Sequence, residues 1–275
     1  MGTLFLVATP IGNLEDLSPR ALRTLHEARL IAAEDTRHTR HLLTHFDIHT
    51  PLTSYYEHNK LAKLDAILAA LAQGDVALVS DAGTPAINDP GYELVKAALG
   101  AGHTVSPVPG PSAPIAAVAA SGLPTDSFLY MGYLPRKASE RREMLAGVAA
   151  LPHTLIFLET PHRLLDALDD LLAVLGDRQM AAARELSKLH EEIYRASISQ
   201  TKAHFSEHEP RGEFTLVVGG NLTVDSGAWS EEKLQKFIAD GLKNNQPAKA
   251  LAAELAKQSG WPRREIYDLI VNQKS

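Results

Sequence analysis

The strongest constraint on the fold is a regular alternation of short apolar runs with segments that have helical spacing. This pattern is typical of βα units, in which helices cover a largely parallel sheet. The strands predicted in the first half of the chain are Thr3–Ala8, Leu30–Ala33, Asp75–Ser80 and His103–Val108. One predicted helix begins at Pro19, and four others cover Thr36–Phe46, Ala62–Gln73, Tyr92–Leu99 and Pro111–Ser121. The sequence therefore predicts an α/β fold.

The alternation pauses near Gly122–Thr125 and restarts with an apolar run at Phe128–Tyr133, which indicates a second α/β domain. The later predicted elements are strands near Thr154–Leu158, Met180–Ala183, Glu192–Ser199 and Phe214–Val218, a helix at Pro161–Leu175, a polar linker at Gly219–Gly227, and helices at Glu231–Leu242, Pro247–Gln258 and Pro262–Asn272. We expect an N-terminal α/β domain at 1–121, a second at 122–225 and a helical tail at 226–275.

The composition excludes several kinds of site. The chain has 275 residues and no cysteine, so it has no disulfide, no thiolate zinc site and no cysteine nucleophile. No apolar run approaches the ~20 residues of a membrane span. The apolar start reaches Pro10 too soon for a signal peptide and has no basic leader. We therefore expect a cytoplasmic protein that does not bind membranes.

The net charge of −6 is unevenly distributed. From Ser226 to Ser275 there are 8 Lys or Arg and 6 Asp or Glu, which leaves 19 basic and 27 acidic residues in the remainder. A large non-specific nucleic-acid surface is basic. Any nucleic-acid contact of the acidic body must therefore use local basic patches.

Three loops rich in glycine and proline follow predicted strands, at Thr9–Asn13, Ser80–Gly91 and Val108–Ala113. Ligands of open α/β sheets bind outside the carboxyl ends of the strands, so three such loops predict a ligand pocket rather than three unrelated turns. Glycine permits close approach of the backbone, and proline keeps a loop rigid. The dinucleotide and Walker fingerprints are absent, which disfavours NAD and ATP.

Seven short motifs, spread over essentially all of residues 3–275, resemble those of one known family. They are Thr9–Asp16, Ala33–Arg37, Ser80–Gly91, Val108–Ala113, Leu158–Arg163, Ala183–Leu186 and Gly212–Thr215. The most specific is the string Ser-Asp-Ala-Gly-Thr-Pro…Asp-Pro-Gly that begins at Ser80. Together they resemble the ribosomal RNA small subunit methyltransferase I family. Asn88 stands where a serine or cysteine is expected, which is a small polar exchange.

The resemblance implies the two-domain tetrapyrrole-methylase fold, with S-adenosylmethionine in the cleft between the domains. It implies 2′-O-methylation of a cytidine, at position 1402 of the 16S rRNA in the small ribosomal subunit, and a homodimer. Carried over by position, the residues implied to bind the cofactor are Pro10, Ile11, Gly83, Thr84, Pro85, Ile87, Ser112, Ala113, Leu158, Leu186 and Thr215.

Asp81 is the leading candidate for a catalytic role because it lies on the cofactor loop. A ribose hydroxyl is a weak nucleophile, and a positioned base adds ~10²–10⁴-fold to such a reaction. The alternative is that Asp81 caps its own turn or orients the cofactor.

The candidate RNA contacts are Glu34, Asp35, Arg37, His58, Asn59, Arg136, Lys137, Arg141, Arg142 and Arg163. Each has a structural alternative. Glu34 or Asp35 is also suited to capping the helix that follows, and Asn59 to a strand-to-helix turn. A basic run such as Arg136–Arg142 is ordinarily solvated surface, but in this acidic body it is the best phosphate patch.

Three histidines, His38, His41 and His45, share one helical face. We predict no metal site there and favour a rim that meets RNA. The tail resembles a helix-turn-helix, which either docks RNA or packs Trp261 against the body of the protein. Two other functions stay open: methylation of a tetrapyrrole or another small metabolite by the same fold, and a non-catalytic RNA-binding factor in ribosome assembly.

Overall fold

The computed structural model describes residues 2–221, 229, 231–243 and 246–272. The chain divides into two compact units, Met1–Gly220 and Asn221–Ser275. Each unit has its own hydrophobic core, and each is described separately. No helix among the described residues is long and apolar enough to cross a membrane.

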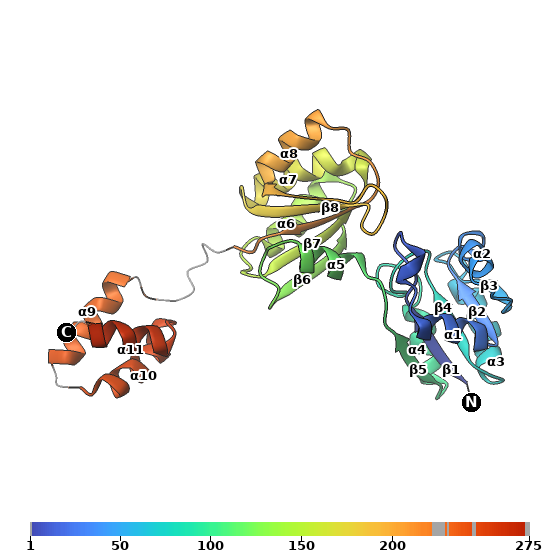
Figure 1. Cartoon of the computed structure of the whole chain (residues 1–275), viewed down its shortest axis with the longest axis horizontal. Helices are drawn as coiled ribbons and strands as arrows, with labels where there is room; N and C mark the ends of the chain where they lie inside the picture. The colour runs from blue at the N-terminus through green and yellow to red at the C-terminus, as the bar shows by residue number, and fades with distance from the viewer. Residues whose placement is uncertain (1, 222–228, 230, 244–245, 273–275) are drawn as a thin grey trace. The chain divides into compact units, whose positions relative to one another are not determined.

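The first sheet of the larger unit has five parallel strands in the order β3-β2-β4-β1-β5 (Figure 1). They are β1 (Thr3–Val7), β2 (Leu30–Ala33), β3 (Leu52–Ser54), β4 (Val76–Val79) and β5 (Thr104–Val108). All four predicted strands are present, and the short strand β3 was not predicted. Because the strands are parallel, the loops after β1, β2, β4 and β5 leave one edge of the sheet.

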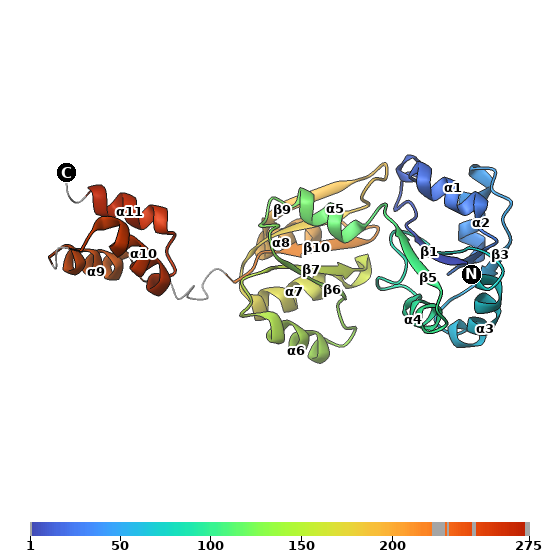
Figure 2. The same cartoon turned by 90° about the horizontal axis from the view of Figure 1, so that it is seen from below.

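Helices cover both faces of this sheet. They are α1 (Pro19–Glu27), α2 (Thr36–His45), α3 (Lys60–Leu71) and α4 (Tyr92–Gly100), with a short 3₁₀ turn η1 (Leu14–Asp16) after β1. Figure 2 shows α1 and α2 on one side and α3 and α4 on the other. The cores agree, since Leu25 and Leu43 pack on one face and Ile67 and Leu94 on the other.

The second sheet has the order β6-β7-β10-β8-β9. Its strands are β6 (Phe128–Tyr133), β7 (Thr154–Glu159), β8 (Gln179–Arg184), β9 (Glu192–Ser197) and β10 (Phe214–Val218). Only β6 and β7 pair in parallel; β10 is antiparallel to β7 and β8, and β8 is antiparallel to β9. The expectation of a largely parallel sheet is therefore wrong for this half. A buried apolar strand has the same composition in either direction, so its sequence does not report its direction.

The helices of this half are α5 (Ala113–Ala120), α6 (Ala138–Val148), the 3₁₀ turn η2 (Pro161–Arg163), α7 (Leu164–Leu175) and α8 (Ile198–Glu207). Alternate residues of the central strands bury on opposite faces, as the pleat requires. Val217 packs with Ala117 of α5, whereas Leu216 packs with Leu168 of α7 and Phe205 of α8. Helix α5 therefore joins the first sheet to the face of the second.

Strand β9 ends earlier than predicted because a new helix begins. The Ser197 side chain accepts from the Gln200 backbone N–H, and the Gln200 side chain accepts from the Ser197 backbone N–H. This reciprocal arrangement is a capping box, which starts α8 at Ile198. The helix was missed because Glu192–Ser199 was interpreted as one strand.

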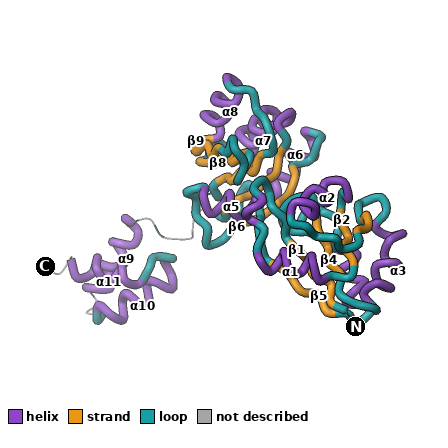
Figure 3. Tube along the Cα trace, turned by 45° about the vertical axis from the view of Figure 1, so that its right-hand side comes forward, coloured by secondary structure: helices purple, strands orange, loops and turns teal. Residues whose placement is uncertain are grey.

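The described part of the smaller unit contains three helices, α9 (Glu231–Lys243), α10 (Ala248–Ser259) and α11 (Arg263–Asn272), as predicted (Figure 3). Leu234, Leu251 and Ile266 contribute one residue from each helix to its core. The Trp261 indole N–H donates to the Trp229 carbonyl oxygen at 2.7 Å, so Trp261 closes the turn between α10 and α11 internally. Most of the predicted linker Gly219–Gly227 lies outside the described residues.

Candidate active site

The loops after β1 and β4 are joined by a pair of backbone hydrogen bonds. Thr9 N–H donates to the Gly83 carbonyl at 2.9 Å, and Gly83 N–H donates to the Thr9 carbonyl at 3.0 Å. Gly83 has a φ of 79°, a left-handed conformation that glycine adopts without strain. Two loops that are remote in sequence therefore form one rigid edge.

The loop after β5 joins the same edge. The Thr84 hydroxyl donates to the Pro111 carbonyl at 3.3 Å. A Cβ added to Gly110 would lie only 3.0 Å from the Ala8 Cβ, so this glycine permits close packing against the end of β1. The three predicted loops are thus one connected structure, with Ser112 and Ala113 at the start of α5.

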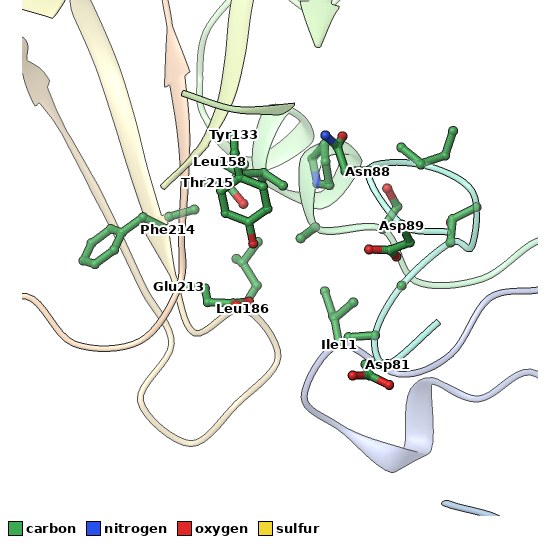
Figure 4. Close-up of a pocket in the computed structure, with 18 of the residues that line it drawn as sticks. Ile11, Asp81, Asn88, Asp89, Tyr133, Leu158, Leu186, Glu213, Phe214 and Thr215 are labelled. Atoms are coloured by element: carbon green, nitrogen blue, oxygen red, sulfur yellow. The ribbon is translucent and has the colours of Figure 1, made fainter. Parts of the chain in front are cut away.

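A cavity of about 270 Å³ lies between these loops, the carboxyl-terminal parts of β6, β7 and β8, and the amino-terminal residues of the antiparallel strand β10. In Figure 4, Ile11, Asp81 and Asp89 lie on one side, and Tyr133, Leu158 and Thr215 on the other. Small-molecule pockets have volumes from about 300 Å³ upward, so the cavity is close to the lower end of that range.

Two close contacts join the walls of the cavity. A Cβ on Gly12 would lie 2.3 Å from the Lys188 Cγ and 3.0 Å from the Leu186 carbonyl oxygen. A Cβ on Gly132 would lie 2.2 Å from the Asn88 Nδ2. At both places a glycine allows a loop of the first half to touch the second half, so the cavity is bounded by contact on two sides.

The cavity is acidic. Its lining includes the carboxyl groups of Glu34, Asp81, Asp89 and Glu213. Burial raises the pKa of Glu34, and Asp89 and Asp81 add to the shift. Burial likewise raises the pKa of Asp89, against a hydrogen bond from Ser80 that lowers it. Such a lining favours a ligand with a positive charge and repels phosphate.

Asp81 is held by the backbone of a neighbouring strand end. Its Oδ1 accepts from the Asp35 backbone N–H at 3.0 Å. This contact orients the carboxylate at the cavity wall, and it is compatible with either of the roles expected for Asp81.

Two tyrosines of β6 line the cavity and were missed in the sequence. Burial raises the pKa of Tyr130 to about 12, and it raises the pKa of Tyr133 as well, so both stay neutral phenols at neutral pH. Tyr133 is 43% exposed and provides an aromatic face at the cavity. The signal that could have found them is the pair of tyrosines in the apolar run Phe128–Tyr133, which leads to the pocket.

Most residues expected to bind a cofactor do line the cavity. These are Ile11, Gly83, Thr84, Ile87, Ser112, Ala113, Leu158, Leu186 and Thr215. Pro10 and Pro85 are not among the lining residues; they flank the loop positions that are. The binding role of all these residues stays a prediction.

Arg141 is not available to RNA, which corrects one expectation. Its side chain is 5% exposed and donates from Nε to Asp170 Oδ2 at 2.6 Å. Arg163 is also engaged, since its Nη2 donates to Glu159 at 2.9 Å and to the Pro135 carbonyl at 3.2 Å. The Glu159 side chain is fully buried, and this burial raises its pKa. The sequence placed Arg141 in a basic run and Arg163 near a helix start, but it did not show that each would pair with a buried acid.

The other RNA candidates lie at the surface. Arg136, Lys137 and Arg142 are exposed, although Lys137 pairs with Glu140 and Arg142 with Asp170. His58 is exposed, whereas Asn59 braces its turn, with its Oδ1 accepting from the Tyr56 backbone N–H at 2.8 Å.

The residues after β2 have mixed roles. Asp35 caps α2, accepting from the Arg37 backbone N–H at 2.8 Å, and pairs with the exposed Arg37 side chain at 2.7 Å. These bonds hold the pKa of Asp35 well below its usual range. Glu34 instead faces the cavity. Asp35 therefore caps the helix, which is the structural alternative to an RNA contact, whereas Glu34 lines the cavity.

Comparison of this sequence with known proteins identifies its family. Residues 3–202 match the family model described as Tetrapyrrole (Corrin/Porphyrin) Methylases. A relative from Halalkalibacterium halodurans named ribosomal RNA small subunit methyltransferase I is 47% identical, with 98% of this chain and 94% of the relative covered. The chain belongs to the ribosomal RNA small subunit methyltransferase I family. A relative of the same name from Synechocystis is 47% identical, with 98% of this chain and 97% of the relative covered. Another from Escherichia coli O157:H7 is 45% identical, with 99% of this chain and 96% of the relative covered.

Solved structures agree with the family fold. A uroporphyrin-III C-methyltransferase from Thermus thermophilus, complexed with S-adenosyl homocysteine, is 23% identical and superimposes with a TM-score of 0.55. The match covers 79% of this chain and 97% of that one. Diphthine synthase, at 15% identity, has a TM-score of 0.58 over 80% of this chain and 90% of its own. The predicted tetrapyrrole-methylase fold is confirmed, and the protein is a methyltransferase.

Proposed function

We propose that this protein transfers a methyl group from S-adenosylmethionine to the 16S rRNA of the small ribosomal subunit. The observation that carries this proposal is the similarity to ribosomal RNA small subunit methyltransferase I proteins over nearly the full length of both chains. The finer proposal, taken from the resemblance of the motifs, is that the acceptor is the ribose 2′-oxygen of cytidine 1402.

The charge of the cavity and the rigidity of its loops support S-adenosylmethionine as the cofactor. S-adenosylmethionine carries a sulfonium cation, which the carboxyl groups of Asp81, Asp89 and Glu213 favour. The joined loops at Gly83, Thr84 and Ser112 offer backbone groups in a rigid arrangement, which lowers the ordering cost of binding. Leu158, Leu186 and Thr215 would close the opposite side. When bound, the cofactor supplies an activated methyl group.

The chain's own residues would orient the acceptor and remove its proton. A transferring methyl needs an in-line approach in a site without water. Asp81 is the residue that we assign to the proton lost by the ribose hydroxyl, because its carboxylate is held at the cavity wall by the Asp35 backbone. Asp89 offers a second carboxyl group in the same cavity, so the two substitutions Asp81→Asn and Asp89→Asn need to be compared.

The remaining proposals concern organisation. We assign the two α/β domains to 1–121 and 122–225 and the helical tail to 226–275. Helix α5 packs on the second sheet although it lies within 1–121, so the chain passes from the first sheet to the second just before this helix, near 109–112. We also propose a homodimer in the cytoplasm.

Mapping of ribose methylation in 16S rRNA tests the function. Cells that lack the gene should have an unmodified ribose at cytidine 1402, and the wild-type gene should restore the methyl group. A restored methyl at that site with Gly83→Val would contradict the proposed pocket. Unchanged methylation in the deletion strain would reject the rRNA proposal and favour a small-molecule substrate.

The same strains separate a catalyst from a non-catalytic assembly factor. A deletion that impairs subunit assembly while the methyl group at cytidine 1402 stays would support the assembly factor.

A further inference from the structure

One face of α2 carries basic groups that the proposed pocket does not use. Arg37, Arg40, His41, Thr44 and His45 follow the spacing i, i+3, i+4, i+7 and i+8, which places them on one side of a helix. The same five residues line a shallow depression on the surface. We call this surface the α2 basic face.

The α2 basic face has cations without matching acids. The sequence of α2 contains two arginines and three histidines and no acidic residue. Arg37 is paired with Asp35, but Arg40 has no ion pair among the described residues, and neither do His41 and His45. In a chain of net charge −6, this surface is a local exception, and it favours a bound anion.

The face begins at the rim of the cavity. Glu34 lines the cavity, and Asp35, which caps α2, donates its backbone N–H to Asp81. The helix therefore leads directly away from the acidic pocket. From Arg37 to His45 it rises about 12 Å, at 1.5 Å per residue, which is long enough to meet more than one phosphate of a nucleic-acid strand.

We propose that the α2 basic face binds the phosphates of the RNA strand next to the nucleotide that enters the pocket. This inference rests on the proposed function. The carboxyl groups of the cavity repel phosphate, so the backbone of the substrate needs a basic surface outside it. Arg40 supplies a permanent cation, and each histidine ring supplies at least one N–H donor in either protonation state. A second copy of the chain is the less suitable occupant, because a two-fold contact centred on this face would bring like charges together.

The test uses the full-length protein with the substitutions Arg40→Gln, His41→Gln and His45→Gln combined, and Arg40→Glu separately. The probe is 16S rRNA, and separately the small subunits, from cells lacking the gene. We expect KM for the RNA to rise about tenfold or more with kcat retained, since a hydrogen bond to a charged group is lost. The slope of log affinity against log salt should fall by about 0.7 for each phosphate contact removed.

The matched control is Lys96→Gln on α4, an exposed cation on the opposite side of the first sheet, which should leave KM and the salt slope unchanged. Cofactor affinity by calorimetry should be equal in all variants. A wild-type KM and salt slope in the triple variant would overturn this inference while leaving the proposed function intact. Altered sedimentation with unchanged KM would also overturn it, in favour of self-association. Wild-type protein that methylates neither probe would instead reject the proposed function.

Discussion

The Arg163 Nη2 donates a hydrogen bond to the buried Glu159 carboxylate at 2.9 Å. The same nitrogen also binds the backbone that follows Tyr133. It donates there to the Leu134 carbonyl and to the Pro135 carbonyl. The Glu159 side chain has no exposed surface, so it depends on this partner and on the Thr160 backbone N–H. The pair therefore fixes the end of β6, where Tyr133 enters the cavity wall.

We predict that Arg163→Met weakens cofactor binding about tenfold, because two carbonyl groups lose their donor and Tyr133 loses its support. Calorimetry with S-adenosylmethionine measures this. Arg163→Lys keeps the charge and one donor direction, and it should recover part of the affinity. A variant that melts at a lower temperature but binds the cofactor normally would limit Arg163 to a structural role.

Arg141 and Asp170 should contribute strongly to stability. The two side chains are 5% and 2% exposed, so Arg141→Ala leaves a carboxylate buried with less compensation. The expected loss is about 3 kcal/mol in the free energy of unfolding, measured with urea. The control is Arg142→Ala, which removes the 61% exposed partner of the same carboxylate and should cost less than about 1 kcal/mol. Equal losses would contradict this ranking.

Gly83→Ala should impair cofactor binding because Gly83 lines the cavity, in addition to the strain from its backbone conformation. An alanine at a φ of 79° costs about 1–2 kcal/mol of backbone strain. Gly122→Ala is the matched control, since Gly122 also has a φ of 79° and has no atom within 4 Å of an added Cβ. Both variants should lose stability, but calorimetry should show weaker cofactor binding only for Gly83→Ala. Equal affinity in the two would argue against the pocket.

The Asp89 carboxyl group should make stability fall as pH rises. Burial raises its pKa above the ordinary 3.8, so the folded protein binds this proton more tightly than the unfolded chain does. The resulting stabilisation is complete below pH 3.8 and is lost as pH rises through the folded-state pKa. Asp89→Asn should therefore raise the melting temperature at pH 7, and the gain should shrink toward pH 4.

Asp177 provides the opposite case for the same experiment. Hydrogen bonds from the Ser199 hydroxyl and backbone N–H lower its pKa, so its contribution is present above pH 3.8 and is lost as pH falls through the folded-state pKa. Asp177→Asn should lower the melting temperature at pH 7, with a smaller effect at low pH. The same sign for both variants would contradict these pKa directions.

The first half of the fold and its loops were predictable because their signals are local. Glycine and proline at Gly83 and Pro111 mark backbone positions directly, and parallel strands bring the loops that follow them to one edge. The family resemblance supplied the tetrapyrrole-methylase fold, which the comparisons confirm. The composition of the loops alone indicated a rigid ligand site, but it did not identify the ligand.

The rest was not predictable because it depends on partners that are distant in sequence. Arg141 has the same sequence context as a surface arginine, and only the fold brings it to Asp170 on α7. The direction of β10 depends on which strands flank it, and its apolar run is compatible with either direction. The position of Tyr133 in the cavity wall depends on the hydrogen bonds from Arg163 to the Leu134 and Pro135 carbonyl oxygens, which cannot be inferred from residue spacing.

The position of β10 has a consequence for the synthesis of the protein. This strand is the last along the described part of the chain, yet it lies in the middle of the second sheet, between β7 and β8. The first sheet is complete once Val108 has been made, whereas the second must wait for residues 214–218. Thr215, a wall of the cavity, therefore arrives last. A nascent chain on its ribosome carries a finished first sheet long before it has a complete pocket.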